Sequence, residues 1–154
     1  MFLSALHSSK SHENEILKEP INIEPIITEG KPGHLLNLDT KDISQRLGIH
    51  FNTNHMFFMN DLDSQLSRGD HSNYNACELL ICMSGSFDIT LDNGSIKKTY
   101  SIEKNQVIYV PKNVWLTFFN FKKCVILVLV DIDYQIKKES EYDYDTFINS
   151  LNNN

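Results

Sequence analysis

The sequence is poor in several features that whole classes of protein depend on. Its 154 residues include three cysteines, four prolines, six glycines and one tryptophan, and 14 Lys and Arg stand against 20 Asp and Glu. The resulting net charge of -6 argues against a nucleic-acid partner, because that affinity comes from clustered basic side chains that release counterions. The longest apolar run, residues 125–130, has the length of a strand and not the roughly 20 residues of a membrane span. We therefore expect neither a nucleic-acid nor a membrane partner.

The few cysteines are placed in a way that argues against two common uses. Cys77, Cys82 and Cys124 are an odd number without C-x-x-C spacing, and each lies in an apolar, strand-like run. A disulfide framework or a zinc site needs paired spacing, whereas a cysteine in such a run usually packs as a small buried hydrophobe. The first residues have no basic flank and do not match a secretory signal. We expect buried cysteines and a cytoplasmic location.

The sequence does contain enough apolar surface for one core. A hydrophobic fraction of 41%, with nine Phe and six Tyr, supports one globular domain at this length. Residues 1–20 are polar and have no sustained period, so we expect an N-terminal arm there and the domain over residues 21–151. Short apolar pieces at 21–27, 35–38 and 56–59 are separated by turn residues, which is typical of strands.

The rest of the chain also has the pattern of strands. Residues 87–91 alternate strictly and end at Asp92-Asn93-Gly94, which indicates a hairpin because these turn residues tolerate positive φ. Strand-sized runs follow at 108–110, 115–119 and 125–130, so we expect an all-β barrel or sandwich. The run at 125–130 is apolar on both faces and must be covered by a second sheet or another subunit. Only residues 142–151 have helical spacing, which predicts a short C-terminal helix.

Polar side chains interrupt this pattern between residues 68 and 78. If residues 71–73 are extended, His71 and Asn73 point to the same face. Glu78 is an odd number of positions after Asn73 and joins that face only if a bulge or turn falls among residues 74–76. The sequence thus predicts a pocket that contains His71 and Asn73 and, with such a turn, Glu78.

These residues resemble the cupin superfamily. Its first motif is a Gly, two His one residue apart, a Glu or Gln, and a second Gly; its second motif is a Pro, a Gly, a His and an Asn. The corresponding residues here are Gly69, His71, Asn73, Glu78 and Gly85, then Pro111, Asn113, Leu116 and Asn120. Metal-binding cupins have three His and one Glu, whereas this chain retains one imidazole and one carboxylate. We therefore expect no metal, because such ions usually need three or more protein donors.

The resemblance is sharper to one branch, the cupin sugar 3,4-ketoisomerases that act on dTDP-4-keto-6-deoxyglucose. The run R-G-D-H-S-N-Y-N-A-C-E-L-L-I-C-M-S-G-S-F-D-I-T-L-D-N-G at 68–94 is similar to their strongest motif, and the likeness covers about residues 20–150. It implies a jelly-roll cupin barrel with a short C-terminal helix, a homodimer, no cofactor and a nucleotide-sugar substrate. It also implies a role in making deoxy sugars for surface polysaccharides such as lipopolysaccharide.

The resemblance also implies catalytic roles. His71 matches the first family histidine and would remove the proton at C3, which the neighbouring C4 carbonyl acidifies. Asn73 replaces a second family histidine and would hold the oxyanion, and Glu78 would orient these groups. The residues that the resemblance assigns to substrate binding are Arg68, His55, Phe58 and Trp115, of which His55 lies near a family Arg and Phe58 at a family Tyr.

Each of these residues also has a purely structural interpretation. His71 is then a hydrogen-bonded strand histidine, and Trp115 belongs to the barrel core instead of stacking on thymine. Arg68 then pairs with Asp70 or Asp63 instead of a diphosphate. An amide cannot carry a proton, so two functions stay open: an isomerase with a reduced set of groups, or a catalytically silent cupin that binds a nucleotide sugar or another small metabolite. Stoichiometric iron, zinc or manganese would instead indicate a metal-dependent cupin.

Overall fold

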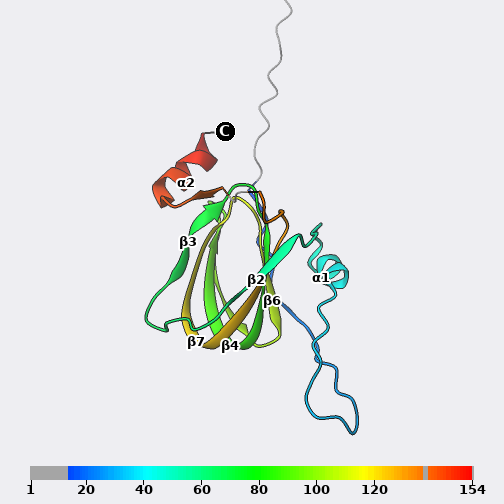
Figure 1. Ribbon diagram of the computed structural model, residues 1–154. Helices are drawn as coiled ribbons and strands as arrows, with labels where there is room; N and C mark the ends of the chain where they lie inside the picture. The colour runs from blue at the N-terminus through cyan, green and yellow to red at the C-terminus, as the bar shows by residue number, and fades with distance from the viewer. Residues whose placement is uncertain (1–13, 137–138, 154) are drawn as a thin grey trace, which may run out of the picture.

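Two long strands run through both sheets of a β-barrel (Figure 1). The computed structural model describes residues 14–136 and 139–153. Strands β4 (Glu78–Asp92) and β7 (Trp115–Val130) pair antiparallel almost from end to end. Their register shifts repeatedly between residues 82 and 88 of β4, where Gly85 has a φ of +66°. Such irregularities bend a strand, so each of the two strands contributes one half to each sheet.

The remaining strands extend these halves into two sheets. The first sheet has the order β1–β6–β4–β7–β2 and includes β1 (Ile21–Asn22), β6 (Gln106–Val110) and β2 (His55–Met59). The second has the order β5–β4–β7–β3–β8 and includes β5 (Lys97–Glu103), β3 (Arg68–Asn73) and β8 (Ser140–Glu141). Their inward apolar side chains form the main core. The predicted all-β jelly-roll barrel is confirmed.

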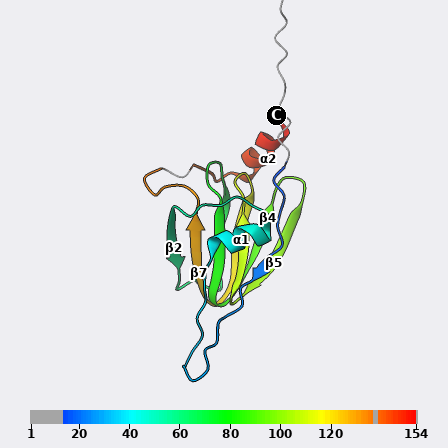
Figure 2. The same ribbon diagram turned by 90° about the vertical axis from the view of Figure 1, so that its right-hand side faces the viewer.

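Helix α1 (Thr40–Leu47) lies across the outer face of the first sheet (Figure 2). Asp39 caps its N-terminus by accepting two backbone N–H bonds, and Gly48 ends it with a left-handed φ of 63°. Its apolar side chains, Ile43 and Leu47, are buried in a second cluster together with residues of β4, β6 and β7. This helix was not predicted from the sequence, although an Asp before it and a Gly after it are typical helix boundaries.

This helix corrects one expectation about the run at 125–130. The inward side chains of Ile126 and Val128 belong to the barrel core. The outward side chains of Leu127 and Leu129 lie in the cluster that includes α1 and Ile23 of the N-terminal segment. The second sheet therefore covers the inward face across the barrel core, as expected, whereas α1 of the same chain covers the outward face.

Two predictions in the second half of the chain are confirmed. The hairpin joins β4 to β5 with Asp92 opposite Lys97. In its loop Gly94 has a φ of +88°, and the Asn93 side chain accepts the N–H groups of Ser95 and Ile96. The C-terminal helix is α2 (Tyr144–Asn152). It lies at one end of the barrel, and the loop after β1 extends from the other end (Figures 1 and 2).

The part of the predicted N-terminal arm that is described, residues 14–20, lies beside the β4–β5 hairpin. Leu17 packs against the barrel core, Asn93 Nδ2 donates to the Glu15 carbonyl at 2.8 Å, and Lys98 forms an ion pair with Glu19. The rest of the arm, residues 1–13, lies outside the described residues. Across the described ranges, no helix has both the length and the apolar character that a bilayer crossing requires.

The three cysteines have free thiols. Cys82 and Cys124 are buried in the barrel core, as the sequence predicts, and Cys77 is partly buried beside α1's cluster. Burial raises the pKa of the Cys77 thiol. These positions fit a packing role.

Candidate functional site

A small cavity of about 160 Å³ opens between β2 and β3, the two strands that pair with different halves of β7. Three polar side chains reach it: Arg68 and His71 from β3 and Glu78 from β4. Its apolar wall and floor consist of Phe57, Met59, Gly69, Leu116, Phe118 and Val128. Binding sites for small molecules in proteins are usually cavities of this kind, with mostly apolar walls and a few polar groups that point inward.

A β-bulge in β3 turns both Arg68 and His71 toward this cavity. Arg68 lies opposite Phe118 and His71 opposite Leu116, and the register shifts between Gly69 and His71. Residues directly opposite each other share a face, so both β3 side chains lie on the inward face of β7. In a regular strand, residues three apart would point to opposite faces. Asp70, which has a φ of 51°, is the extra residue of the bulge. Because of it, Arg68 and His71 point to the same face of the strand.

Glu78 reaches the cavity because the chain turns between β3 and β4. Residues 74–77 leave the strand conformation, and β4 then enters the other sheet with Glu78 opposite Val130 and Val110. The side chain is buried, with 4% exposure. A turn among residues 74–76 was the condition for Glu78 to face the same pocket as His71, and the structure brings these two residues together.

Arg68 has no ion-pair partner among the described residues. The Asp70 carboxylate instead accepts hydrogen bonds from Ser67 Oγ at 3.1 Å and Thr117 Oγ1 at 2.9 Å. Asp63 accepts the backbone N–H of Gln65. The surface pairing considered for Arg68 is therefore absent here, and its exposed guanidinium is available at the cavity to an anionic ligand.

Asn73 is not among the residues that line the cavity. It is 1% exposed, and its Oδ1 accepts a hydrogen bond from Ser140 Oγ at 2.8 Å. Its buried Nδ2 has no hydrogen-bond partner in the described part of the chain. Asn73 also pairs with Ser140 in the β3–β8 ladder, so its contacts connect the two strands.

The other three residues predicted to bind substrate lie elsewhere. Phe58 is 61% exposed and faces away from the cavity, while its neighbour Phe57 faces inward. Trp115 packs on the outside of the barrel against Tyr144 and Phe147 of α2.

His55 lines a separate open groove of about 710 Å³, together with Met56, Phe57, Ile132, Tyr134, Gln135 and Ile136. Its Nδ1 donates to the Ile132 carbonyl at 2.7 Å. Because a carbonyl oxygen only accepts, this bond fixes the proton on Nδ1.

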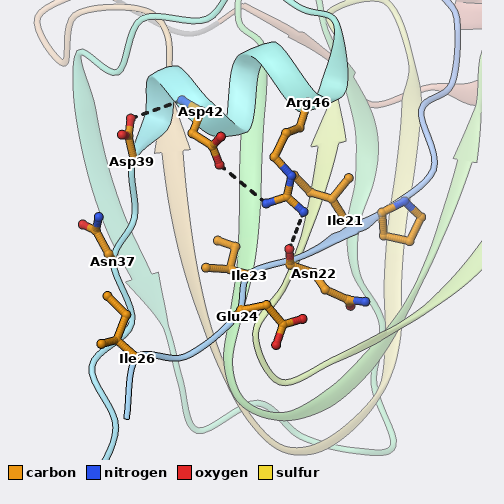
Figure 3. Close-up of a pocket in the computed structure, with 10 residues that line it drawn as sticks. Ile21, Asn22, Ile23, Glu24, Ile26, Asn37, Asp39, Asp42 and Arg46 are labelled. Atoms are coloured by element: carbon orange, nitrogen blue, oxygen red, sulfur yellow. Dashed lines mark hydrogen bonds and ion pairs between the residues drawn. The ribbon is translucent and has the colours of Figure 1, made fainter. Parts of the chain in front are cut away.

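A larger depression lies between α1 and the segment around β1 (Figure 3). Its volume is about 750 Å³, and its charged side chains are Glu24, Asp39, Asp42 and Arg46. Arg46 donates to the Asn22 carbonyl at 2.6 Å and forms an ion pair with Asp42 at 3.6 Å, and Asp39 caps α1. These contacts hold the helix against the N-terminal segment, so the polar groups serve the packing of α1.

One residue that the sequence analysis missed lies beside the cavity. The rings of His71 and Tyr142 have their centroids 5.5 Å apart, at an interplanar angle of 40°. Tyr142 follows β8 and is 73% exposed. Nothing in the local sequence links it to His71. Within the described ranges, no group of three or more His, Cys, Asp or Glu side chains is arranged to hold a metal ion.

Comparisons with known proteins agree with this fold. The curated TDP-4-oxo-6-deoxy-α-D-glucose 3,4-oxoisomerase of Aneurinibacillus thermoaerophilus is 28% identical over 107 residues, which are 68% of this chain and 76% of that protein. A 3,4-ketoisomerase structure from Helicobacter canadensis has a TM-score of 0.74 and 26% identity, and covers 88% of this chain and 97% of its own. The TDP-fucose 3,4-ketoisomerase WlaRA of Campylobacter jejuni has a TM-score of 0.71 and 29% identity, with coverages of 88% and 96%.

The barrel and its cavity define a cupin of the sugar-isomerase type. More specifically, the chain belongs to the FdtA family, described as WxcM-like, C-terminal, whose sequence model matches residues 26–152. A histidine-to-asparagine variant of a further similar protein, the 3,4-ketoisomerase QdtA of Thermoanaerobacterium thermosaccharolyticum, has been crystallised with TDP-4-keto-6-deoxyglucose. That structure is 25% identical, has a TM-score of 0.71, and covers 86% of this chain and 92% of its own.

Proposed function

We propose that the protein is a sugar 3,4-ketoisomerase that acts on TDP-4-keto-6-deoxyglucose or a close relative. The observation that carries this proposal is the meeting of His71 and Glu78 in one apolar cavity, with the guanidinium of Arg68 beside them. Three of the similar proteins are described as 3,4-ketoisomerases or a 3,4-oxoisomerase.

The cavity suits proton transfer between C3 and C4 of a keto sugar. The proton at C3 is acidified by the C4 carbonyl, and an imidazole is a suitable base for it near neutral pH. Glu78 is buried at the same cavity, where it orients the reacting groups. The surrounding Leu116, Phe118 and Val128 exclude water, which strengthens each electrostatic contact to the enediolate.

Arg68 is the group that we assign to the diphosphate. Its planar guanidinium matches phosphate oxygens in a bidentate geometry. The cavity of about 160 Å³ is smaller than the roughly 300–1,000 Å³ of sites that enclose a whole ligand. We therefore place the sugar in the cavity and the nucleotide outside it. His55, Phe58 and Trp115 are not part of this proposed site.

The proposal is tested by incubating the protein with TDP-4-keto-6-deoxyglucose in heavy water and following the sugar by NMR. We expect a TDP-linked 3-keto product that carries deuterium at C4, and exchange of deuterium into C3 of the remaining substrate. Thermal stabilisation by the sugar nucleotide without product or label would overturn the isomerase and favour the second candidate, a catalytically silent binding protein. The observation that favours this second candidate is Asn73 at the position of a second family histidine, because an amide cannot carry a proton.

We further propose a cytoplasmic homodimer whose product enters the synthesis of surface polysaccharides such as lipopolysaccharide. β2 is an edge strand, since β7 is the one strand that it pairs with in the described part of the chain. Its Met56 and Phe58 are 60% and 61% exposed. A second copy of the chain would cover this apolar edge. An apolar edge strand that stays uncovered can pair with other chains and aggregate. The free thiols agree with a reducing compartment. Analytical ultracentrifugation tests the dimer, and a monomer for the wild type, or a Phe58→Glu variant that stays dimeric, would contradict this interface.

A further inference from the structure

The reaction proposed above moves protons at two kinds of atom, and the cavity holds few groups that can carry them. One proton moves from C3 to C4, and another must move between the oxygens on these carbons. His71 can carry the first. Of the other polar residues lining the cavity, Arg68 stays protonated at all relevant pH values, and Glu78 is the residue assigned above to orienting the reacting groups. Asn73, at the position of the second family histidine, is an amide and exchanges no proton.

Tyr142 is the hydroxyl-bearing residue that the tertiary structure brings to His71. Its ring centroid lies 5.5 Å from that of the imidazole. The side chain is 73% exposed, so its phenol is accessible from solvent beside His71, which lines the cavity. A phenol can both donate and accept a proton, and tyrosine is among the side chains that serve as general acids and bases.

The contact between the two rings follows from the β3–β8 ladder. Ser72 lies opposite Glu141 and Asn73 opposite Ser140 in an antiparallel register. Continuing this register by one residue puts Tyr142 opposite His71, and directly opposite side chains share one face of a sheet. Tyr142 is therefore presented to the same face of β3 from which His71 enters the cavity.

Several hydrogen bonds fix β8 in this register. The Ser140 hydroxyl donates to Asn73 Oδ1 at 2.8 Å, and the Tyr74 N–H donates to the Glu139 carbonyl at 2.8 Å. The Tyr74 hydroxyl also donates to Glu141 at 3.1 Å. Burial and this bond raise the pKa of Tyr74, which keeps it protonated as a donor. On the other side, Asp143 caps α2 immediately after Tyr142, so the position of Tyr142 is fixed from both directions.

We propose that Tyr142 is a second catalytic residue of this site and exchanges protons with the sugar oxygens while His71 carries the carbon-bound proton. The inference rests on the proposed isomerase function. Asn73 then acts as a positioning residue, because its bond to Ser140 holds the strand that presents Tyr142.

His71 and Tyr142 together account for every proton that moves in the reaction. In the first step His71 removes the proton from C3, the C3–C4 double bond forms, and the Tyr142 phenol protonates the C4 oxygen, which leaves an enediol, an imidazolium and a phenolate. In the second step the phenolate removes the proton from the C3 hydroxyl, the C3 carbonyl forms, and the imidazolium gives its proton to C4. Both side chains return to their starting state, and the carbonyl has moved from C4 to C3.

The test compares the wild type with Tyr142→Phe, which keeps the ring beside His71 and removes only the hydroxyl. With TDP-4-keto-6-deoxyglucose as substrate, we expect kcat to fall by at least about 100-fold, the lower range for loss of a general acid or base. KM and the melting temperature stay close to the wild-type values, because the ring contact and the ladder remain. The matched control is Tyr134→Phe, another exposed tyrosine whose ring contacts a histidine, His55, at 5.7 Å; it should retain the wild-type kcat.

The two proposals fail in different ways. If the wild type is active and Tyr142→Phe keeps its kcat within about threefold, less than the loss of a general acid would cause, the role of Tyr142 is overturned and the isomerase stands. An equal fall of kcat in Tyr134→Phe would also overturn it, because the effect would not depend on Tyr142. If the wild type gives neither product nor label, the proposed function fails and the role of Tyr142 fails with it.

Discussion

Trp115 and Tyr144 meet edge to face on the outer surface of the barrel, with ring centroids 5.2 Å apart and an interplanar angle of 84°. Phe147 of the same helix packs against the indole at 5.6 Å, and Tyr144 donates a hydrogen bond to Asp92 at 2.6 Å. The contacts of Trp115 with Tyr144 and Phe147 thus pack α2 against the second sheet. Its neighbour Leu116 faces the cavity instead.

Replacing Trp115 with Phe should therefore affect stability and not substrate binding. Partial loss of these ring contacts is expected to lower the free energy of unfolding by about 1–3 kcal/mol, measured by urea denaturation. The KM for the sugar nucleotide should not change, since the indole lies on the face away from the cavity. A large rise in KM with unchanged stability would instead support the stacking of Trp115 on the nucleobase.

Replacing His71 with Gln should remove the base and leave the barrel intact. The amide occupies a similar volume but carries no proton, so we expect deuterium exchange at C3 and product formation to fall by about 10²–10⁴-fold. The matched control is His50→Gln, whose side chain is exposed and lines a different surface depression near α1. Comparable activity in both variants would rule out His71 as the base.

The protein should lose stability at alkaline pH because of Tyr109. Burial, and after it the hydrogen bond with Cys77, raises the pKa of Tyr109 well above its ordinary value of 10.0. The folded state then keeps a proton that the unfolded chain releases, so the contribution of Tyr109 to stability is complete below about pH 10 and is lost as the pH rises beyond it.

The slope for one such group is at most about 1.4 kcal/mol per pH unit. Unfolding curves between pH 9 and 11 should show this fall in the wild type and a smaller one in Tyr109→Phe. Parallel curves for the two proteins would show that other tyrosines cause the alkaline loss.

Replacing Gly85 with Ala should be far more damaging than the same change at Gly33. A Cβ at Gly85 would lie 2.0 Å from the Lys122 carbonyl oxygen and 2.4 Å from that of Lys123, both backbone atoms. A Cβ at Gly33 would meet nothing within 4 Å, although both glycines have positive φ. Gly33→Ala thus reports the backbone strain alone, about 1–2 kcal/mol.

The difference between these two variants isolates the clash at the bend of β4. We expect the melting temperature of Gly85→Ala to fall well below that of Gly33→Ala, by the equivalent of at least about 2 kcal/mol, or the variant to be recovered only as aggregate. Equal melting temperatures would mean that β4 and β7 can move apart at Gly85 without a loss of folding free energy.

Much of the fold follows from local sequence signals. Alternating residues and the Asp92-Asn93-Gly94 turn predicted the β4–β5 hairpin, and the spacing at 142–151 predicted α2. Helix α1 was missed because its eight residues contribute few apolar positions, and their period is weak beside the strand-like pieces around them. The separate runs predicted at 115–119 and 125–130 belong to one continuous strand, β7, because irregular residues between them also occur at bulges and need not end a strand.

The amino-acid sequence by itself determined the family, the barrel, and the candidate residues Arg68, His71 and Glu78. Only the tertiary structure decided which side chains face the cavity. Residues 56–59 are apolar on both faces, so alternation could not say whether Phe57 or Phe58 points inward. In a regular strand Arg68 and His71 would point to opposite faces, but the bulge at Asp70 puts both on the cavity side. The pairing of β3 with β8, which is distant in the sequence, brought Tyr142 to His71. Pairing between strands far apart in the chain leaves no local signal, because each strand has the same period whichever partner it meets.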